Sequence, residues 1–311
     1  MKARILTHNR DMKRLLIIGC GDIALRTIPL LTRRYRVFAL VRTPARREAL
    51  HALGATPIPG DLDNRASLAR IAGLVDVVMH FAPPPSFLPS TKEAGHEFDF
   101  ADTRTRNLLA ALSQGKLPEQ LIYISTSGVY GDCSGAWVSE SHPLNAQTAR
   151  AQRRVNAERQ IRNWAKRNRI KISILRVPGI YAADRLPINR LQQGTPCLID
   201  SEDSYTNHIH ADDLAHISIA ALRHAKTGRV YHASDDSHLK MGEYFDRVAD
   251  ALNLPHVPRI SRNEAQCMLP ESLLSFMHES RRLDNRRMKR ELKVMLRYPT
   301  VADFLATLKS G

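Results

Sequence analysis

The feature that most constrains the fold is a short apolar segment, residues 14–18, which stops at Gly19 and is followed at once by residues with helical spacing. This is the pattern of a buried parallel strand that turns sharply into a helix. Gly19 can adopt backbone angles that are closed to other residues, and Gly21 lets a ligand approach the main chain. Ala24 is small enough for the helix to pack closely on the strand.

The first turn of this predicted helix offers the rest of a binding site. Backbone N–H groups at Asp22 and Ile23, together with the positive end of the helix dipole, suit an anion such as a pyrophosphate. The spacing Gly-x-Gly-x-x-Ala is the relaxed form of the dinucleotide-binding fingerprint. A tight strand-to-helix turn without a ligand has the same sequence, so the turn alone leaves both interpretations open.

Strand-like and helix-like segments alternate along the chain, which is typical of a doubly wound parallel sheet. The expected strands are residues 36–41, 55–62, 75–82, 120–125, 170–177 and 229–233, and the expected helices are 23–35, 103–113, 149–167 and 214–225. After residue 181 the alternation loosens. We therefore predict an α/β protein with a Rossmann-type doubly wound sheet over residues 12–181. A smaller C-terminal substrate lobe covers most of residues 182–311, and residues 206–235 return to the sheet.

Composition limits the class of protein. A chain of 311 residues with 43% hydrophobic content can bury a proper core. No apolar run approaches the ~20 residues that span a bilayer, so we expect no membrane contact. The four cysteines show no paired spacing, which suits a reducing cytoplasm and gives no zinc signal. Residues 1–11 carry charges without an apolar segment and are predicted to be a disordered leader.

The net charge of +15 allows two interpretations. One is nucleic-acid binding. The other is a set of solvated, arginine-rich helix faces with a bias toward phosphorylated ligands. Basic pairs are spread over many segments, and no single arm combines basic and aromatic residues, so the second interpretation is favoured.

The residue after the second expected strand bears on cofactor choice. In a βαβ nucleotide fold this position meets the adenosine ribose, where an acid would hold the free 2′-hydroxyl of NAD. Here it is Arg42, whose guanidinium cannot accept those hydrogen bonds but would pair with a 2′-phosphate. This favours NADP(H), with NAD(H) still possible. Arg42 could also be an ordinary surface residue, and Arg46 or Arg47 could bind the phosphate instead.

Two further groups of residues suggest other chemistry. His208, His210 and Asp212 would share one face of an extended segment and could hold a metal. The favoured interpretation is that Asp212 caps a helix that starts at Leu214. Ser125 to Ser127 could suggest a hydrolase, but the sequence has no Gly-x-Ser-x-Gly elbow.

Several motifs occur together and in order. They are the Gly-x-Gly-x-x-Ala turn, Gly60-Asp61-Leu62, His80-Phe81-Ala82, Asn107-Leu108-Leu109, Ser125-Thr126-Ser127-Gly128-Val129-Tyr130-Gly131, Glu140-Ser141-x-Pro143, Leu175-Arg176-x-Pro178-Gly179-Ile180-Tyr181, His208-Ile209-His210-Ala211-Asp212-Asp213 and Ser280-Arg281-Arg282-Leu283-x-Asn285. The series resembles the extended short-chain dehydrogenase/reductase superfamily, in the NAD-dependent epimerase/dehydratase branch that acts on nucleotide sugars. The resemblance covers nearly the whole chain from Met12.

The resemblance implies roles for particular residues. Asp61 and Leu62 would lie at the adenine, Phe81 and Ala82 along the cofactor, Pro178 and Tyr181 at the nicotinamide, and Tyr181, Asn207 and His210 on the substrate side. Thr126 would be the active-site hydroxyl that hydrogen-bonds the reacting oxygen.

One departure from the family is decisive. The family places a Tyr-x-x-x-Lys pair seven residues after the Pro of the Glu-Ser-x-Pro turn, where the lysine holds the ribose and lowers the pKa of the tyrosine. Here those positions are Arg150 and Arg154, and residues 149–167 contain no tyrosine. A guanidinium stays protonated and cannot act as a general base. Arg154 could still bind the ribose, and Arg150 could bind an anion or polarise a carbonyl.

Three outcomes follow from this departure. Another group supplies the proton, with Tyr130, Tyr181, Tyr205 and His210 as candidates by position; the reaction needs no strong acid or base; or the protein binds NADP(H) without turnover. The leading hypothesis is a cytoplasmic NADP-dependent oxidoreductase or epimerase-like enzyme acting on a nucleotide sugar or similar phosphorylated metabolite. Thr126, Arg150 and Tyr130 are its predicted catalytic residues. The alternative is a non-catalytic NADP(H)-binding sensor, and helix 149–167 is a candidate surface for a homodimer.

Overall fold

The computed structural model describes residues 12–85 and 100–309, so the predicted leader at residues 1–11 lies outside the described residues. The chain forms two compact units. Unit 1 comprises Met1–Ser125, Gln152–Leu175 and Ala215–Val230, and unit 2 comprises Thr126–Ala151, Arg176–Leu214 and Tyr231–Gly311.

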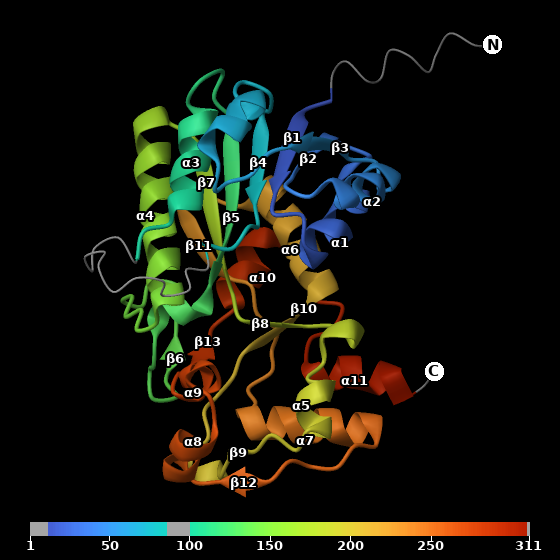
Figure 1. The fold of residues 1–311 in the computed structure, drawn as a ribbon, viewed down its shortest axis with the longest axis vertical. Coiled ribbons are helices and arrows are strands. Elements are labelled where there is room, and N and C mark those ends of the chain that lie inside the picture. Colours follow the sequence, from blue (N-terminus) through green and yellow to red (C-terminus); the bar gives the residue numbers. More distant parts are fainter. Residues whose placement is uncertain (1–11, 86–99, 310–311) are drawn as a thin grey trace, which may run out of the picture. The chain divides into compact units, whose positions relative to one another are not determined.

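Unit 1 is built on a seven-stranded sheet with the strand order β11-β7-β5-β4-β1-β2-β3 (Figure 1). The strands are β1 Arg14–Ile18, β2 Arg36–Val41, β3 Thr56–Pro59, β4 Val77–His80, β5 Gln120–Thr126, β7 Lys171–Val177 and β11 Arg229–His232. The pairings of β1 with β2 and β4, of β2 with β3 and of β4 with β5 are parallel. This order and direction confirm the predicted doubly wound α/β sheet.

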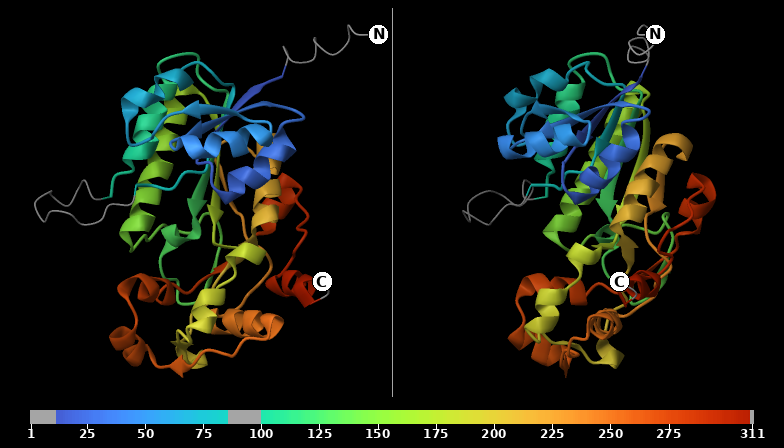
Figure 2. Two further views of the ribbon diagram at one scale, coloured as in Figure 1. Left: turned by 45° about the vertical axis from the view of Figure 1, so that its right-hand side comes forward. Right: turned by 90° about the vertical axis from the view of Figure 1, so that its right-hand side faces the viewer.

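Helices cover both faces of this sheet. They are α1 Asp22–Leu31, α2 Arg47–Ala52, α3 Thr103–Leu112, α4 Ala149–Asn168 and α6 Ala211–His224, with the 3-10 helices η1 Pro44–Arg46 and η2 Arg65–Ile71. Helices α3 and α4 lie along one face, and α1 and α6 along the other (Figure 2). Alternate strand residues such as Leu16, Ile18 and Leu121 pack with Ile161 and Trp164 of α4 in one apolar core. Burial of each such side chain contributes about 1.5–3 kcal/mol, which holds the helices to the sheet.

Most predicted elements occur where the sequence placed them, with one early helix end. Strand β2 has the predicted bounds, and α3 differs from its prediction by a single residue. The helix predicted over 23–35 ends at Leu31 instead, because the chain must turn back before β2. The N–H groups of Arg34 and Tyr35 both bond the carbonyl of Leu31, and β2 then begins in register with β1.

The residues before the helix expected from Leu214 do not form the simple turn that their sequence suggests. Residues His208–His210 form strand β10, which pairs in parallel with β8 (Gly179–Tyr181), and α6 begins directly at Ala211. This pairing depends on a strand nearly thirty residues earlier, so local sequence does not reveal it.

The predicted helix cap at Asp212 is also wrong, since that residue lies inside the first turn of α6. The Nδ1 atom of His210 accepts the N–H of Asp212 at 3.2 Å and satisfies one free donor of this turn. The carboxylate of Asp213 instead accepts the N–H groups of Arg297 and Tyr298, at 2.7 and 3.0 Å.

Unit 2 contains short strand pairs and helices. The strand pairs are β8 with β10, β6 Trp137–Val138 with β13 Arg282–Leu283, and β9 Cys197–Leu198 with β12 Arg259–Ile260. The helices are η3 Ser127–Tyr130, η4 Ala183–Arg185, α5 Ile188–Gln192, η5 Asp200–Glu202, α7 Met241–Leu252, α8 Arg262–Met268, α9 Glu271–Met277, α10 Arg286–Leu292 and α11 Val301–Lys309. Its main core joins Tyr181 to Phe245 and Val248 of α7 and to Phe304 of α11. Within the described residues of both units, no helix has the length and apolar character needed to cross a bilayer.

Candidate functional site

The turn between β1 and α1 is as tight as the glycine pattern predicted. Gly19 has φ +89°, and a Cβ atom at this position would lie 2.3 Å from the nitrogen of Ala82. The N–H groups of Phe81 and Ala82 both donate to the carbonyl of Ile18, at 2.7 and 3.0 Å. The backbone after β4 therefore passes directly against the turn, and only glycine fits between them.

The N-terminus of α1 is open. Gly21 is exposed, and a Cβ atom built on it meets no atom within 4 Å. Gly21, the N-cap residue, has no side chain to cap this end of the helix, while Ile23 and Ala24 are buried and fix it to the sheet. The carboxylate of Asp22, which would repel an anion, is paired with Arg26 at 2.8 Å. This open, neutralised helix end fits a pyrophosphate.

Two arginines after β2 differ in their contacts. The Nη1 atom of Arg46 donates to the carbonyl of Cys20 at 2.7 Å, which places its guanidinium beside the glycine turn. Burial raises the pKa of the Cys20 thiol to about 12, so this cysteine is not a nucleophile. Arg42 is exposed, and its charge, after the hydrogen bond from Arg104, helps to hold the pKa of Asp63 below its ordinary value.

The predicted adenine residues lie in a braced turn. The amide of Asn107 donates to the carbonyl of Leu62 at 2.8 Å, and the hydroxyl of Ser67 accepts the N–H of Asp61 at 2.8 Å. The Asp61 carboxylate in turn accepts the N–H of Asp63 at 3.0 Å. These bonds fix the turn after β3 and explain the Asn-Leu-Leu motif as a support for it.

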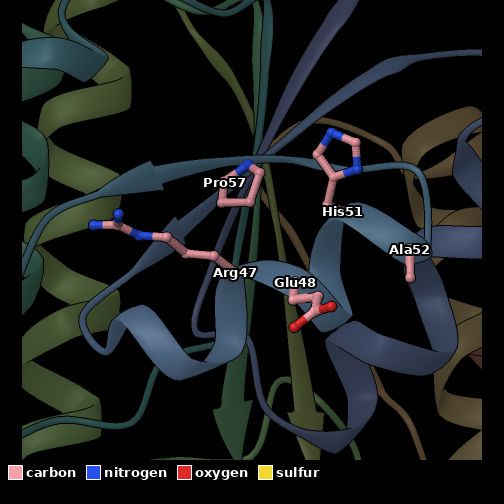
Figure 3. Close-up of a pocket in the computed structure, with 5 residues that line it drawn as sticks. All are labelled: Arg47, Glu48, His51, Ala52 and Pro57. Carbon is pink, nitrogen blue, oxygen red and sulfur yellow. The ribbon is translucent and has the colours of Figure 1, made fainter.

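A separate cavity of about 410 Å³ lies between α2 and β3 (Figure 3). Its lining residues are Arg47, Glu48, His51, Ala52 and Pro57. The side chains of Arg47 and Glu48 point away from one another. Of the residues considered for the cofactor, Arg47 alone, the alternative ligand of the 2′-phosphate, lines this cavity, so we do not include the cavity in the candidate site.

Arg154, at the family's lysine position, is held at the end of β5. Its Nη1 atom donates to the carbonyl of Ile124 at 2.7 Å and to the hydroxyl of Tyr123 at 3.1 Å. Burial raises the pKa of Tyr123 to about 12 despite this cation, so its phenol stays protonated. Tyr123 packs on the ring of His80, at 5.1 Å between centroids. Burial, with Arg154 as the lesser cause, lowers the pKa of His80 to about 3 and keeps it neutral.

Two of the predicted catalytic residues are accessible within unit 2. The Oγ1 atom of Thr126 accepts the N–H of Gly128 at 3.2 Å, so its own proton remains available for a substrate oxygen. Arg150 is exposed, and its guanidinium lies 4.4 Å above the ring of Phe276. A guanidinium on an aromatic face is partly desolvated and still free to meet an anion at its edge.

The third predicted catalytic residue, Tyr130, lies in the interior of unit 2, and its hydroxyl is already hydrogen-bonded. The carbonyl of Asp284 can only accept, so the Nδ1 of His232 donates to it at 2.9 Å and its Nε2 accepts the Tyr130 proton at 2.6 Å. Arg176 donates to the Tyr130 hydroxyl at 2.7 Å and to the carbonyl of Glu140 at 3.3 Å. Tyr130 is 1% exposed. The geometry therefore favours a structural role for Tyr130 over the predicted catalytic one.

The predicted substrate contacts are also in the interior. Tyr181 is buried, and its ring packs against His210, which bonds its own helix. Burial raises the pKa of Tyr181. The amide of Asn207 is used twice, donating to the carbonyl of Arg281 and accepting from the N–H of Leu283, both at 2.9 Å. These contacts indicate structural roles in place of substrate binding, while Pro178 remains partly exposed between β7 and β8.

The histidine pair considered as a metal site packs against aromatic rings. His208 stacks on Tyr244 at 4.2 Å between ring centroids, and His210 contacts Tyr298 and Phe304 at 4.3 and 4.8 Å. Across the described parts of the chain, no three histidine, cysteine, aspartate or glutamate side chains are arranged to hold a metal ion.

Comparison with known proteins identifies the family. A family model described as "NAD dependent epimerase/dehydratase family" matches residues 26–234. The chain belongs to this family. Human dTDP-D-glucose 4,6-dehydratase is 25% identical over 166 residues, which are 51% of this chain and 47% of that protein. The chain thus spans about half the length of this curated relative.

Solved structures of this fold match almost the whole chain. A functionally unknown conserved protein from Silicibacter pomeroyi aligns with a TM-score of 0.76 at 26% identity, covering 96% of this chain and 99% of its own. A dTDP-glucose 4,6-dehydratase from Streptomyces venezuelae, solved with NAD bound, aligns with a TM-score of 0.75 at 22% identity, covering 96% of both chains. The two likenesses agree with the epimerase/dehydratase fold.

Proposed function

We propose that this protein is an NADP(H)-dependent oxidoreductase or epimerase-like enzyme that acts on a nucleotide sugar or a similar phosphorylated metabolite. The observation that carries the proposal is the open helix end at Gly21, which follows the tight turn at Gly19 and the carbonyl of Cys20 that Arg46 hydrogen-bonds. Family membership and the NAD-bound dehydratase of the same fold support a dinucleotide at this turn.

The preference for NADP(H) rests on charge. Arg42 and Arg46 follow β2, where NAD-selective proteins of this fold place an acid. A 2′-phosphate adds close to two negative charges, which a guanidinium can bind through two parallel hydrogen bonds. Both side chains are exposed; Arg46 is already hydrogen-bonded at the turn and supports the phosphate from there, and Arg42 can move to it.

The chemistry that we propose is oxidation or reduction of a carbon that bears a hydroxyl or carbonyl group. A nicotinamide cofactor supplies or receives the hydride when it is bound. Thr126 orients the substrate oxygen through its free proton, and Arg150 stabilises negative charge that develops there or binds the substrate phosphates. The substrate class rests on the relatives' dTDP-glucose and on the excess of positive charge.

The test is a fluorescence titration of the purified protein with NADPH and with NADH. We expect tighter binding of NADPH, and a loss of about tenfold in NADPH affinity for Arg42→Ala or Arg46→Ala with little change for NADH. Arg33→Ala serves as the matched control, because Arg33 is an exposed arginine just after the opposite, C-terminal end of α1. No binding of either coenzyme would refute the proposed function, and equal affinity for both would refute the NADP(H) preference.

A second candidate is a non-catalytic NADP(H)-binding sensor. Two observations favour it: Arg154 is already hydrogen-bonded to the carbonyl of Ile124 and the hydroxyl of Tyr123, and α4 contains no tyrosine. The double variant Arg150→Tyr with Arg154→Lys restores the family pair. Turnover that appears only in this variant would support the sensor, whereas turnover by the unaltered chain would exclude it.

A further inference from the structure

A segment near the C-terminus is hydrogen-bonded to the loop that follows Thr126. Within unit 2, the N–H of Ser280 donates to Asp132 at 2.9 Å, and the carbonyl of Ser280 accepts the N–H groups of Cys133 and Gly135 at 3.0 Å each. The pairing of β6 with β13 continues this contact. Glu279 precedes Ser280, so its position relative to the loop is fixed by backbone hydrogen bonds.

The carboxylate of Glu279 is buried and half-paired. Its side chain is 7% exposed, and its Oε2 atom accepts from the Nη1 of Arg281 at 2.9 Å. The same Nη1 donates to the carbonyl of Gly131 at 2.6 Å, and the carbonyl of Arg281 accepts from Asn207. The Oε1 atom of Glu279 is buried and has no hydrogen-bond partner among the described residues.

This carboxylate lies beside the active-site loop at Gly128. A Cβ atom built on Gly128 would be 3.6 Å from the Oε2 of Glu279 and also 3.6 Å from the Oγ1 of Thr126. The carboxylate and the predicted substrate-orienting hydroxyl therefore flank the same glycine. An alanine at position 128 would fit in ordinary contact with both groups, and only a longer side chain would come between them.

An unpartnered carboxylate oxygen in the interior is costly, since it loses its hydration without a compensating hydrogen bond. The Arg281 pair uses only Oε2, and the Nε of Arg281 is likewise buried without a partner among the described residues. A substrate hydroxyl held by Thr126 would supply the missing donor.

We propose that Glu279 is the proton-transfer residue of this enzyme, in place of the phenol that the family carries on α4. In the oxidative direction, the carboxylate accepts the hydroxyl proton of the substrate while the carbon of that hydroxyl gives up a hydride to the oxidised nicotinamide cofactor. The alcohol becomes a carbonyl, the cofactor gains two electrons, and the proton on Glu279 passes to solvent. Arg281 is a positioning residue that holds the carboxylate in place. This inference rests on the proposed function.

The experiment compares four proteins: the unaltered chain, Glu279→Gln, Glu279→Ala and the control Glu271→Gln. Glu271 is an exposed glutamate at the start of α9 in the same unit. Turnover of dTDP-glucose, UDP-glucose and UDP-glucuronic acid is followed by chromatography of the sugar nucleotides as well as by nicotinamide absorbance, because an epimerase returns the hydride to the sugar and leaves the absorbance unchanged. Calorimetry measures the affinities for NADPH and for the sugar nucleotides, and thermal unfolding reports whether each variant is folded.

We expect Glu279→Gln to lower kcat by about 10²- to 10⁴-fold, the usual contribution of a general acid or base. Affinities for NADPH and sugar nucleotide should stay within about threefold, and Glu271→Gln should match the unaltered chain. Added formate should restore part of the activity of Glu279→Ala, which a purely structural role does not allow.

Other outcomes separate the two proposals. A kcat of Glu279→Gln within about threefold of the unaltered chain would overturn the role of Glu279 and leave the proposed function standing. A fall in kcat without formate rescue, and with lost sugar-nucleotide binding, would overturn it in favour of a structural ion pair. Absence of turnover by the unaltered chain with all three nucleotides would overturn both.

Discussion

Replacement of either glycine in the β1–α1 turn by alanine should separate folding from cofactor binding. At Gly19, an alanine must adopt φ +89° and place its Cβ 2.3 Å from the nitrogen of Ala82. The left-handed region costs roughly 1–2 kcal/mol, and a forced backbone shift in a packed core roughly 1–3 kcal/mol. We therefore expect Gly19→Ala to lower the free energy of unfolding by roughly 2–5 kcal/mol.

Gly21 is the matched control, because its φ of −84° suits alanine and no atom lies within 4 Å of the added Cβ. Gly21→Ala should leave stability within about 1 kcal/mol of the unaltered chain. Its methyl group fills the space through which a pyrophosphate would reach the helix end, so NADPH affinity should fall about tenfold or more.

The assay is urea denaturation followed by tryptophan fluorescence. The chain has two tryptophans, and a Trp137→Phe background leaves Trp164, in the core of unit 1, as the reporter. Coenzyme fluorescence measures the NADPH affinity of the same samples. The reasoning is refuted if Gly19→Ala unfolds within about 0.5 kcal/mol of its parent, or if Gly21→Ala binds NADPH within about twofold of it.

Two further predictions concern the interior of unit 2. Tyr130→Phe removes the hydroxyl between Arg176 and His232, and urea denaturation should show a loss of roughly 2–4 kcal/mol in the free energy of unfolding. NADPH affinity should stay unchanged. A fully stable variant that has lost turnover would instead support a catalytic role for Tyr130. Burial lowers the pKa of His208 from 6.5 to about 3, so its neutral form contributes fully above pH 6.5 and that contribution falls with pH toward 3. His208→Phe keeps an aromatic ring stacked on Tyr244 but cannot be protonated. For each unit that the pH falls between 6.5 and 3, the free energy of unfolding of the variant should therefore rise by up to ~1.4 kcal/mol relative to the unaltered chain. Unfolding free energies that run parallel from pH 7 to 5 would contradict this.

Local sequence predicted the parts of the fold that depend on near neighbours. Strand β2 and helix α3 follow from an apolar run and from helical spacing, which act within ten residues. Strand β10 was missed because three residues carry no period, and its identity as a strand depends on pairing with the distant β8.

In the candidate site, too, the features that depend on the local backbone were predictable and those that depend on distant residues were not. The spacing of Gly19 and Gly21 predicted a tight turn and an open helix end, because both properties belong to the backbone itself. The burial of Tyr130 could not be predicted from its motif, since its hydroxyl is taken by Arg176 and His232 from other parts of the chain.

The sequence alone does not indicate a role for Glu279, for a similar reason. It lies in no motif position with acid–base spacing, and only tertiary contacts bring it to Gly128, some 150 residues earlier in the sequence. Gly128 gives no signal for the carboxylate either, because a methyl group at this position would meet only ordinary contacts.

The shared volume at Gly128 has an evolutionary consequence. A methyl group at position 128 fits beside the carboxylate at position 279, but a longer side chain there competes with it for space, so a bulky mutation at position 128 changes which residues position 279 tolerates. Homologues should therefore show paired substitution, with bulk in the loop accompanied by loss of the distant glutamate. A lineage that exchanged one arrangement for the other would have to pass through an intermediate with both groups or with neither.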